Sequence, residues 1–225
     1  LISKDDVDGA YAKFLTNATI ATYGVEGMSE YRFEATDYSF AHGYRGNFYA
    51  AEWSEPVQIE PQVYDEFTLR QVVAACAVGV KVGLTASQIF SGVQRITPLN
   101  GHMARLRGVE DSSILDNTAT NSPLGSKNSL QALYQISAPQ RIAVIGAMHK
   151  LGHRTAAAHQ EVGMLCDGAQ LAWVVTVGAD ANRHSAPAAR ARGCQVKECQ
   201  DAIEAGAFVR SVLEPGGVVL FDGPE

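Results

Sequence analysis

The second half of the chain alternates short, continuous apolar runs with segments of helical spacing. The clearest apolar runs are 141–148 (RIAVIGAM), 171–178 (LAWVVTVG) and 216–223 (GGVVLFDG). An apolar run of strand length without polar alternation is typical of a strand that is buried on both faces, as in a parallel sheet covered by helices. Because such strands are joined by right-handed crossovers, the pattern predicts a doubly wound α/β domain, with a mostly parallel Rossmann-like sheet, from about residue 108 to the end.

The elements between these runs are read from spacing and from capping residues. Thr155 is expected to cap the helix that it precedes, Pro187 to interrupt the next helix, and Gly193 to end it. Two further strands are expected at 112–116 and 194–199, and helices at 126–136, 155–166, 179–193 and 201–213.

The first half has a different pattern. Residues 18–53 are rich in aromatic side chains with partial alternation, which predicts an antiparallel meander, and the two prolines of 56–64 favour an edge strand. Two helices are expected to follow. The first, 67–84, is apolar around most of its surface, and the second, 85–96, begins with a capping-box pattern.

Composition excludes several classes of function. The chain has 225 residues and a net charge of −6, which argues against binding to nucleic acid or to an anionic membrane surface. No apolar run reaches the roughly 20 residues that span a bilayer, and no signal peptide is recognised, so we expect a cytoplasmic protein. The four cysteines lack CxxC spacing and are expected to be reduced, with a Cys194–Cys199 bridge or metal pair as the alternative.

A polar loop follows the strand that ends near Asp116. Asp116, Asn117 and Thr118 would lie at the carboxyl end of a parallel strand, where open α/β sheets bind ligands. The alternative is structural: these side chains would form turn hydrogen bonds, and Ser122 would cap a helix whose first residue is Pro123.

A second polar loop follows the apolar run 141–148. His149, His153 and the later His159 invite a metal site, but the intervening Leu-Gly favours a loop, so we assign no metal ligand. Lys150 could bind an anion at this edge of the sheet. The ordinary alternative is a lysine exposed to solvent.

Several segments together resemble the Mur ligase family, in particular its D-alanyl-D-alanine-adding branch. LDNTATNSP stands where these ligases have Asp-Asp-Thr-Tyr-Asn-x-x-Pro, and RIAVIGAMHKLG with the later HQEVG resembles RIAVLGDMxELG with HxxVG. GGVVLFDG is similar to the terminal GDVVLxKGS, and NGHM stands where the family has Pro-Gly-Arg-Met. The helix pair starting at QVVAACAVGV and the first segment, SKDDVDGAYAKFLTNATIATYG, also fit.

The resemblance implies the rear part of an ATPase domain at 1–99, a linker at 100–107 and a C-terminal α/β domain at 108–225. It implies ATP-dependent amide-bond formation in peptidoglycan synthesis, with ATP and Mg²⁺ as cofactors. The matching nucleotide-binding positions are Gln71, His102, Asp116, Asn117 and Thr118, and the substrate-binding positions are Ser122, His149 and Lys150. No catalytic residue is assigned.

The departures from the family are as informative as the matches. The sequence contains no G-x-x-x-x-G-K-[ST] motif, and the family's N-terminal domain and the front of its ATPase domain would lie before Leu1. The family's linker arginine is His102, its loop tyrosine is Ala119, its glutamate is Lys150, and its terminal lysine is Asp222. We therefore expect no catalysis by this chain alone.

Three alternatives follow: one half of a split ligase, a pseudoenzyme or scaffold that makes protein contacts, and a chain that retains only nucleotide binding at the Asp116 loop. The cofactor expectation divides accordingly between ATP with Mg²⁺ and no cofactor at all. Because the helix at 67–84 is apolar on most sides, we also expect self-association or a partner chain through the N-terminal portion.

Overall fold

The structure is a computed structural model that describes residues 1–5, 14, 17–25, 27–119 and 121–223. It divides into two compact units, Leu1–Thr97 and Pro98–Glu225. Part of the first segment that resembles the family, residues 6–13 and 15–16, lies outside the described residues.

The second unit is built on one mixed sheet with the strand order β10-β9-β8-β11-β7-β6. Neighbouring strands run parallel from β10 to β7, and only the edge strand β6 pairs antiparallel. The strands are β6 (Ala104–Arg107), β7 (Ser113–Asn117), β8 (Arg141–Gly146), β9 (Trp173–Val177), β10 (Val196–Cys199) and β11 (Val218–Asp222). The expected doubly wound fold is confirmed. The segment 100–107, expected as a connection, contains β6.

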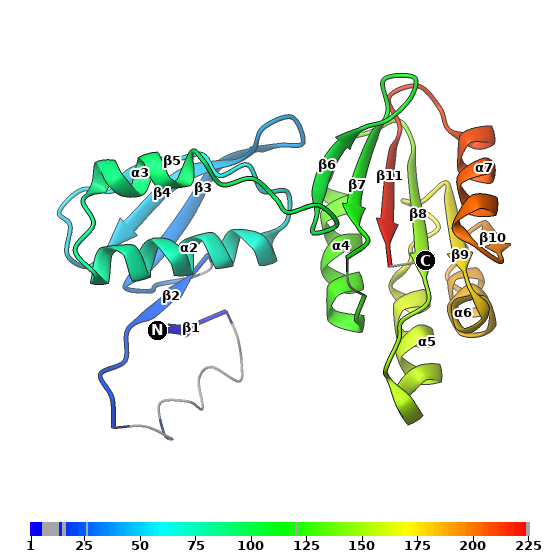
Figure 1. Cartoon of the computed structure of the whole chain (residues 1–225), viewed down its shortest axis with the longest axis horizontal. Helices are drawn as coiled ribbons and strands as arrows, with labels where there is room; N and C mark the ends of the chain where they lie inside the picture. Colours follow the sequence, from blue (N-terminus) through cyan, green and yellow to red (C-terminus); the bar gives the residue numbers. More distant parts are fainter. Residues whose placement is uncertain (6–13, 15–16, 26, 120, 224–225) are drawn as a thin grey trace. The chain divides into compact units, whose positions relative to one another are not determined.

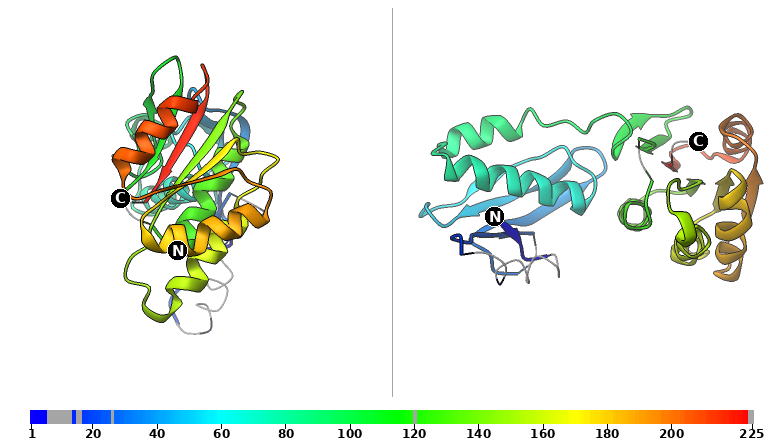
Figure 2. Two further views of the ribbon diagram at one scale, coloured as in Figure 1. Left: turned by 90° about the vertical axis from the view of Figure 1, so that its right-hand side faces the viewer. Right: turned by 60° about the horizontal axis from the view of Figure 1, so that its bottom comes forward.

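Helices cover both faces of this sheet (Figures 1 and 2). Three helices lie on one face, and α7 lies on the other, where Ala205 and Val209 pack on Ile142, Val144 and Val219. Burial from both sides explains why these strands carry continuous apolar runs. The helices are α4 (Pro123–Gln135), α5 (Thr155–Leu165), α6 (Ala186–Ala191) and α7 (Ala202–Val212), with short turns η1 (Gly152–Arg154) and η2 (Ala181–Ser185).

Two helix starts differ from expectation. Thr155 does not cap α5. It is the first residue of the helix, and its hydroxyl donates a hydrogen bond to the Gly152 carbonyl, 2.8 Å away, because the turn η1 precedes it. The segment interrupted near Pro187 begins with the π-helical turn η2, and α6 follows with Pro187 in its first turn.

The first unit has a five-stranded sheet in the order β1-β2-β3-β4-β5. The strands β3, β4 and β5 form the expected antiparallel meander, with β5 at the edge. The pairs β1–β2 and β2–β3 are parallel, so the expectation of an antiparallel arrangement from residue 18 onward is wrong. The strands are β1 (Ile2–Ser3), β2 (Thr22–Gly24), β3 (Tyr31–Ser39), β4 (Gly43–Ala50) and β5 (Val57–Ile59).

Two helices, α2 (Glu66–Lys81) and α3 (Ala86–Val93), pack on one face of this sheet (Figure 2). The side chain of Asp65 caps α2, and Thr85 and Gln88 form the expected capping box of α3. Tyr31, Phe33 and Phe48 of the sheet are fully buried against the helices. Hydrophobic burial on this one face holds the unit together.

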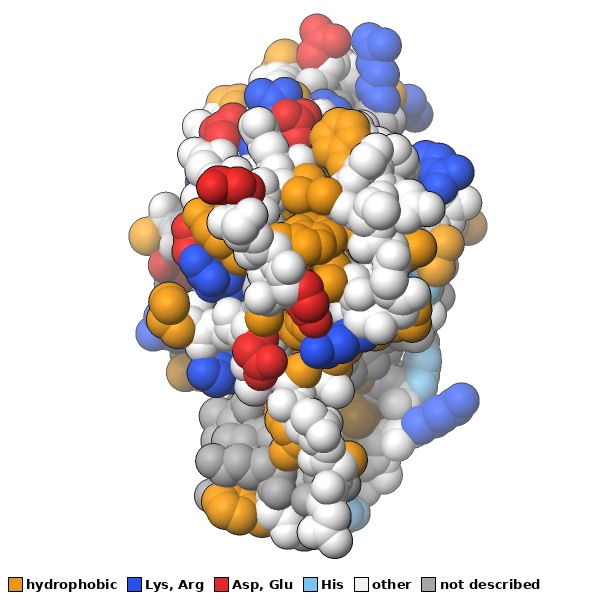
Figure 3. Space-filling model, turned by 90° about the vertical axis from the view of Figure 1, so that its left-hand side faces the viewer, with side chains coloured by type: hydrophobic (Ala, Val, Ile, Leu, Met, Phe, Trp, Pro, Cys, Tyr) orange, Lys and Arg blue, Asp and Glu red, His pale blue; other side chains and the backbone are white. Residues whose placement is uncertain are grey.

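The outer side of α2 is also apolar. Phe67 and Val78 are about half exposed, and Val82, just after the helix, is 72% exposed. Hydrophobic side chains also gather near the middle of the face shown in Figure 3, with acidic and basic side chains around them. Exposed apolar surface of this kind often marks an interaction site.

Candidate functional site

The carboxyl ends of β7, β11 and β8 form the candidate site. The strand order places β11 between β7 and β8, so the chain crosses over β11 through α4 and later returns through α7 to fill the gap. In doubly wound sheets, ligands bind outside the carboxyl ends of the parallel strands. Polar side chains from β7, β11 and the loop before α4 meet at this edge.

Asp116, near the end of β7, is held by its own chain through both carboxylate oxygens. Oδ1 accepts hydrogen bonds from the Thr118 N–H at 3.2 Å and the Thr118 hydroxyl at 2.7 Å. Oδ2 accepts from the Gly101 N–H at 2.9 Å. A carboxylate that accepts from three donors is held in one orientation.

Asn117 points to the other face of the strand and contacts β11. Its amide nitrogen donates to Oδ1 of Asp222 at 2.6 Å. Asn121 lies beside this pair: its Nδ2 donates to the carbonyl oxygens of Gly146 and Asp222 at 3.2 and 3.4 Å, and its Oδ1 accepts from the Ser126 hydroxyl. Asn117 and Asn121 therefore tie β7, β8, β11 and the start of α4 together.

Asp222 is the least satisfied group at this edge. It is 2% exposed, and its Oδ2 has no hydrogen-bond partner within the described part of the chain. The nearby Ser126 and Ser129 hydroxyls donate elsewhere, to Asn121 and to the Ser126 carbonyl. Burial raises the pKa of the Asp222 carboxyl, and the Ser126, Asn117 and Ser129 side chains offset only part of this. A protonated Asp222 could donate its proton to either serine hydroxyl.

The loop after β8 separates its polar side chains. His149 and Lys150 are exposed, and Lys150 has a left-handed backbone with φ of 62°. His159 is fully buried in α5, where Nε2 accepts from the Met148 N–H at 2.9 Å and Nδ1 faces the Thr155 carbonyl at 2.8 Å. These partners require the neutral ring with its proton on Nδ1. Both ring nitrogens therefore serve the fold.

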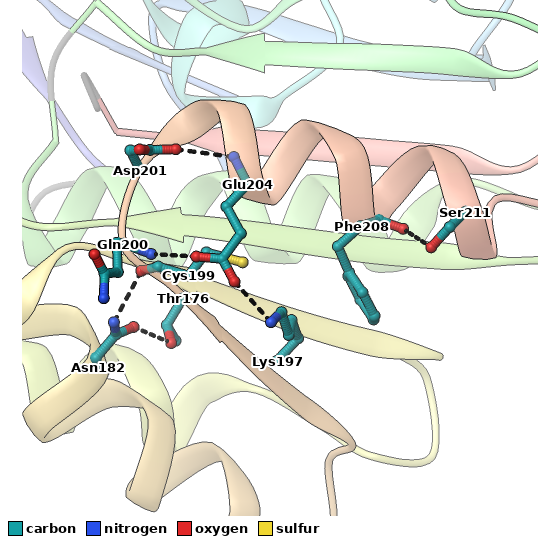
Figure 4. A network of polar contacts seen from close by, with 9 residues as sticks. All are labelled: Thr176, Asn182, Lys197, Cys199, Gln200, Asp201, Glu204, Phe208 and Ser211. Carbon is teal, nitrogen blue, oxygen red and sulfur yellow. Dashed lines mark hydrogen bonds and ion pairs between the residues drawn. The ribbon is translucent and has the colours of Figure 1, made fainter.

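At the carboxyl ends of β9 and β10, polar side chains hydrogen-bond to one another and to the backbone (Figure 4). Asn182 donates to the Cys199 carbonyl at 2.8 Å and accepts from the Thr176 hydroxyl at 2.7 Å. The Glu204 carboxylate accepts from Lys197 and from the Gln200 N–H at 2.7 and 2.9 Å. These contacts fix η2 and the start of α7 to the strand ends, which is a structural role.

The remaining predicted positions are dispersed. Gln71 lies exposed on α2 in the first unit, and His102 lies exposed in the second. Ser122 caps α4 by accepting from the Gly125 N–H at 3.1 Å, with Pro123 as the first helical residue, as the structural alternative anticipates. Of the predicted site residues, Asp116 and Thr118 are joined by hydrogen bonds, whereas Asn117 bonds to Asp222 on the other face of β7.

Sequence reasoning did not single out Asn121 or Ser126 and treated Asp222 only as a replaced lysine. The only available signal was an asparagine in a polar loop and an acidic residue ending an apolar strand. All four cysteines are free and buried. Within the described ranges, no three His, Cys, Asp or Glu side chains are grouped to hold a metal ion, and no helix is long and apolar enough to cross a bilayer.

The sheet and its covering helices define a doubly wound α/β domain. A family described as "Mur ligase, glutamate ligase domain" matches residues 103–224, which is more than half of the chain. The chain belongs to the Mur ligase family.

Relatives and solved structures agree with this assignment. The UDP-N-acetylmuramoyl-tripeptide–D-alanyl-D-alanine ligase of Synechocystis is 30% identical over 149 residues, which is 66% of this chain and 32% of that protein. The Escherichia coli ligase of the same name is 26% identical over 49% of this chain and 24% of its own length. The aligned parts thus span a third or less of these relatives.

The fold as a whole is similar to solved MurF structures. The Acinetobacter baumannii structure matches with a TM-score of 0.80 at 18% identity, covering 98% of this chain and 47% of that one. The Thermotoga maritima MurF in complex with ADP matches with a TM-score of 0.78 at 19% identity, covering 97% and 48%. At this identity the likeness concerns the fold alone.

Proposed function

We propose that this chain carries the rear part of an ATP-dependent, amide-bond-forming ligase of peptidoglycan synthesis and does not catalyse that reaction alone. The observation that carries the proposal is the state of Asp116. In the family this carboxylate helps to hold the ribose side of the nucleotide, whereas here both oxygens accept hydrogen bonds from Gly101 and Thr118. Three donors of the chain itself therefore already hold this carboxylate in one orientation.

The replaced positions support the same proposal. His102 stands where the resemblance places an arginine, and a neutral imidazole offers one donor in place of a charged, forked guanidinium. Ala119 lacks the flat tyrosine surface that could pack on a base. Asp222 places a buried carboxyl where the family has a lysine, so this position offers no positive charge to a phosphate.

A phosphate-release assay tests catalysis directly. The chain is mixed with Mg-ATP, a UDP-linked muramoyl tripeptide and D-alanyl-D-alanine, and a complete ligase from the family is run in parallel as the positive control. We expect phosphate release from the complete ligase and none above background from this chain. Turnover that depends on all three substrates would overturn the proposal.

The outer side of α2 favours a second function, a scaffold that makes protein–protein contacts. Phe67, Val78 and Val82 leave apolar surface exposed on the first unit, and covering it would release water from that surface. We expect self-association or a partner chain there. Light scattering across a concentration series should give a mass that rises above the monomer and falls in Val78→Lys. A monomer at every concentration would contradict self-association through this surface.

A further inference from the structure

The segment that connects the two units is bonded to the strand-end loop of the second unit. The Gly101 N–H donates to Oδ2 of Asp116 at 2.9 Å, and the Gly101 carbonyl accepts from the Ala119 N–H at 2.9 Å. Gly101 thus bonds to the strand-end loop through both of its backbone polar groups. We call the set Gly101, Asp116, Thr118 and Ala119 the linker latch.

Only glycine fits at the centre of this latch. The His102 N–H bonds to the Leu99 carbonyl at 3.0 Å, which closes a turn whose third residue, Gly101, has φ of +75°. A Cβ atom at Gly101 would lie 2.7 Å from the Ala119 nitrogen and 2.8 Å from the Ala119 Cβ. Both the backbone conformation and the close approach therefore require the absence of a side chain.

Asp116 is held ready for this contact by its own loop. Thr118 donates two hydrogen bonds to Oδ1, which leaves Oδ2 directed at Gly101. A hydrogen bond to an ionised acceptor is stronger than one between neutral groups. Beyond the latch, Met103 is 7% exposed and is followed by β6, so the chain is anchored again within two residues.

We propose that Asp116 is a positioning residue that fastens Gly101 to the strand-end loop, so that the chain from Gly101 onward moves as part of the second unit. A ligand that takes the place of the Gly101 N–H on Oδ2 would free this segment. The latch itself does not depend on the proposed function.

Amide hydrogen exchange of the whole chain tests the latch. In the wild type, the Gly101 and Ala119 amides should be protected. In Asp116→Ala both should exchange at least about tenfold faster, since a bond to a charged acceptor is lost. The Ala119 amide is the decisive readout, because its own acceptor is Gly101 and not Asp116. The amides of β8 should remain protected, which shows that the variant is folded.

Matched variants separate the alternatives. Asp111→Asn, which alters an exposed carboxylate of the same unit, should change neither amide. Asp116→Asn keeps one acceptor oxygen and should give an intermediate rate if the alanine variant does not fold. Unprotected Gly101 and Ala119 amides in the wild type, or faster exchange of Gly101 alone in Asp116→Ala, would overturn the latch. Faster exchange of both amides on adding Mg-ATP would mean that a nucleotide displaces Gly101 from Asp116, and would overturn the structural role that the proposed function gives to Asp116.

Discussion

Two carboxylate side chains near the ends of neighbouring strands, Asp116 of β7 and Asp222 of β11, have different surroundings. Asp222 of β11 is in register with Asn117 of β7, so Asp116, one residue earlier, points to the other face. Asp116 is partly exposed and accepts three hydrogen bonds, whereas Asp222 is buried and accepts one on Oδ1 with none on Oδ2. The difference teaches that the donors around a strand-end carboxyl, and not its place at the sheet edge, decide its role.

The largest effect is expected from Asp116→Ala. The change removes the acceptor of three hydrogen bonds and leaves the Gly101 and Thr118 N–H groups unpaired, at a cost of about 3 kcal/mol of unfolding free energy. Urea unfolding followed by circular dichroism measures this. Asp111→Asn should stay within about 0.5 kcal/mol of the wild type. An equal loss in both variants would mean that Asp116 has no special structural role.

Gly101→Ala should have the second largest effect. It should lower the free energy of unfolding by about 2 kcal/mol, because alanine strains the left-handed backbone and its Cβ clashes with Ala119. The same unfolding experiment applies. Gly193 also has a positive φ, of 79°, but nothing lies within 4 Å of its would-be Cβ. Gly193→Ala therefore shows the conformational cost alone. If the two alanine variants lose the same free energy, the close approach at Gly101 contributes nothing.

Asp222→Asn should raise the free energy of unfolding at neutral pH, whereas the two preceding variants should lower it. Because burial raises the pKa of Asp222 in the folded state, its contribution to stability is complete below the pKa of the unfolded chain and is lost as the pH rises through the folded value. Each unit of pKa difference corresponds to about 1.4 kcal/mol. The variant should therefore gain stability relative to the wild type between pH 4 and pH 8. A difference that does not change with pH would contradict a raised pKa.

The smallest effect is expected from Thr118→Val. The variant loses the hydroxyl bond to Oδ1 of Asp116 but keeps the backbone bond, so we expect a loss of about 1 kcal/mol. In the Asp116→Ala background the same change should cost almost nothing. A double-mutant cycle measures this coupling. Additive losses would show that Thr118 does not act through Asp116.

The sequence predicts the second unit well because its strands are buried on both faces, and the continuous runs at 141–148 and 171–178 allow few alternatives. It predicts the first unit less well. The pairing of β1 with β2 involves only two residues of each strand and is supported by Asp5, whose carboxylate accepts from the Val25 N–H at 2.8 Å. A contact between residues so far apart leaves no periodic signal.

In the site as well, contacts that are local in sequence could be predicted, and contacts between distant residues could not. The cap formed by Ser122 and Pro123 could be predicted because it is local in sequence. The bond from Asn117 to Asp222 joins residues 105 positions apart and depends on β11 lying beside β7. The latch depends on the turn at Gly101 meeting Asp116, which a sequence-based description of a polar loop does not specify. Thr120 lies outside the described residues.

The central claim is that Asp116 serves the fold of this chain and does not hold a nucleotide. Isothermal titration calorimetry with Mg-ATP tests it most directly, with the wild type and Asp116→Asn compared under the same conditions. We predict no saturable heat of binding to either protein. Saturable binding to the wild type that is lost in Asp116→Asn would contradict the claim.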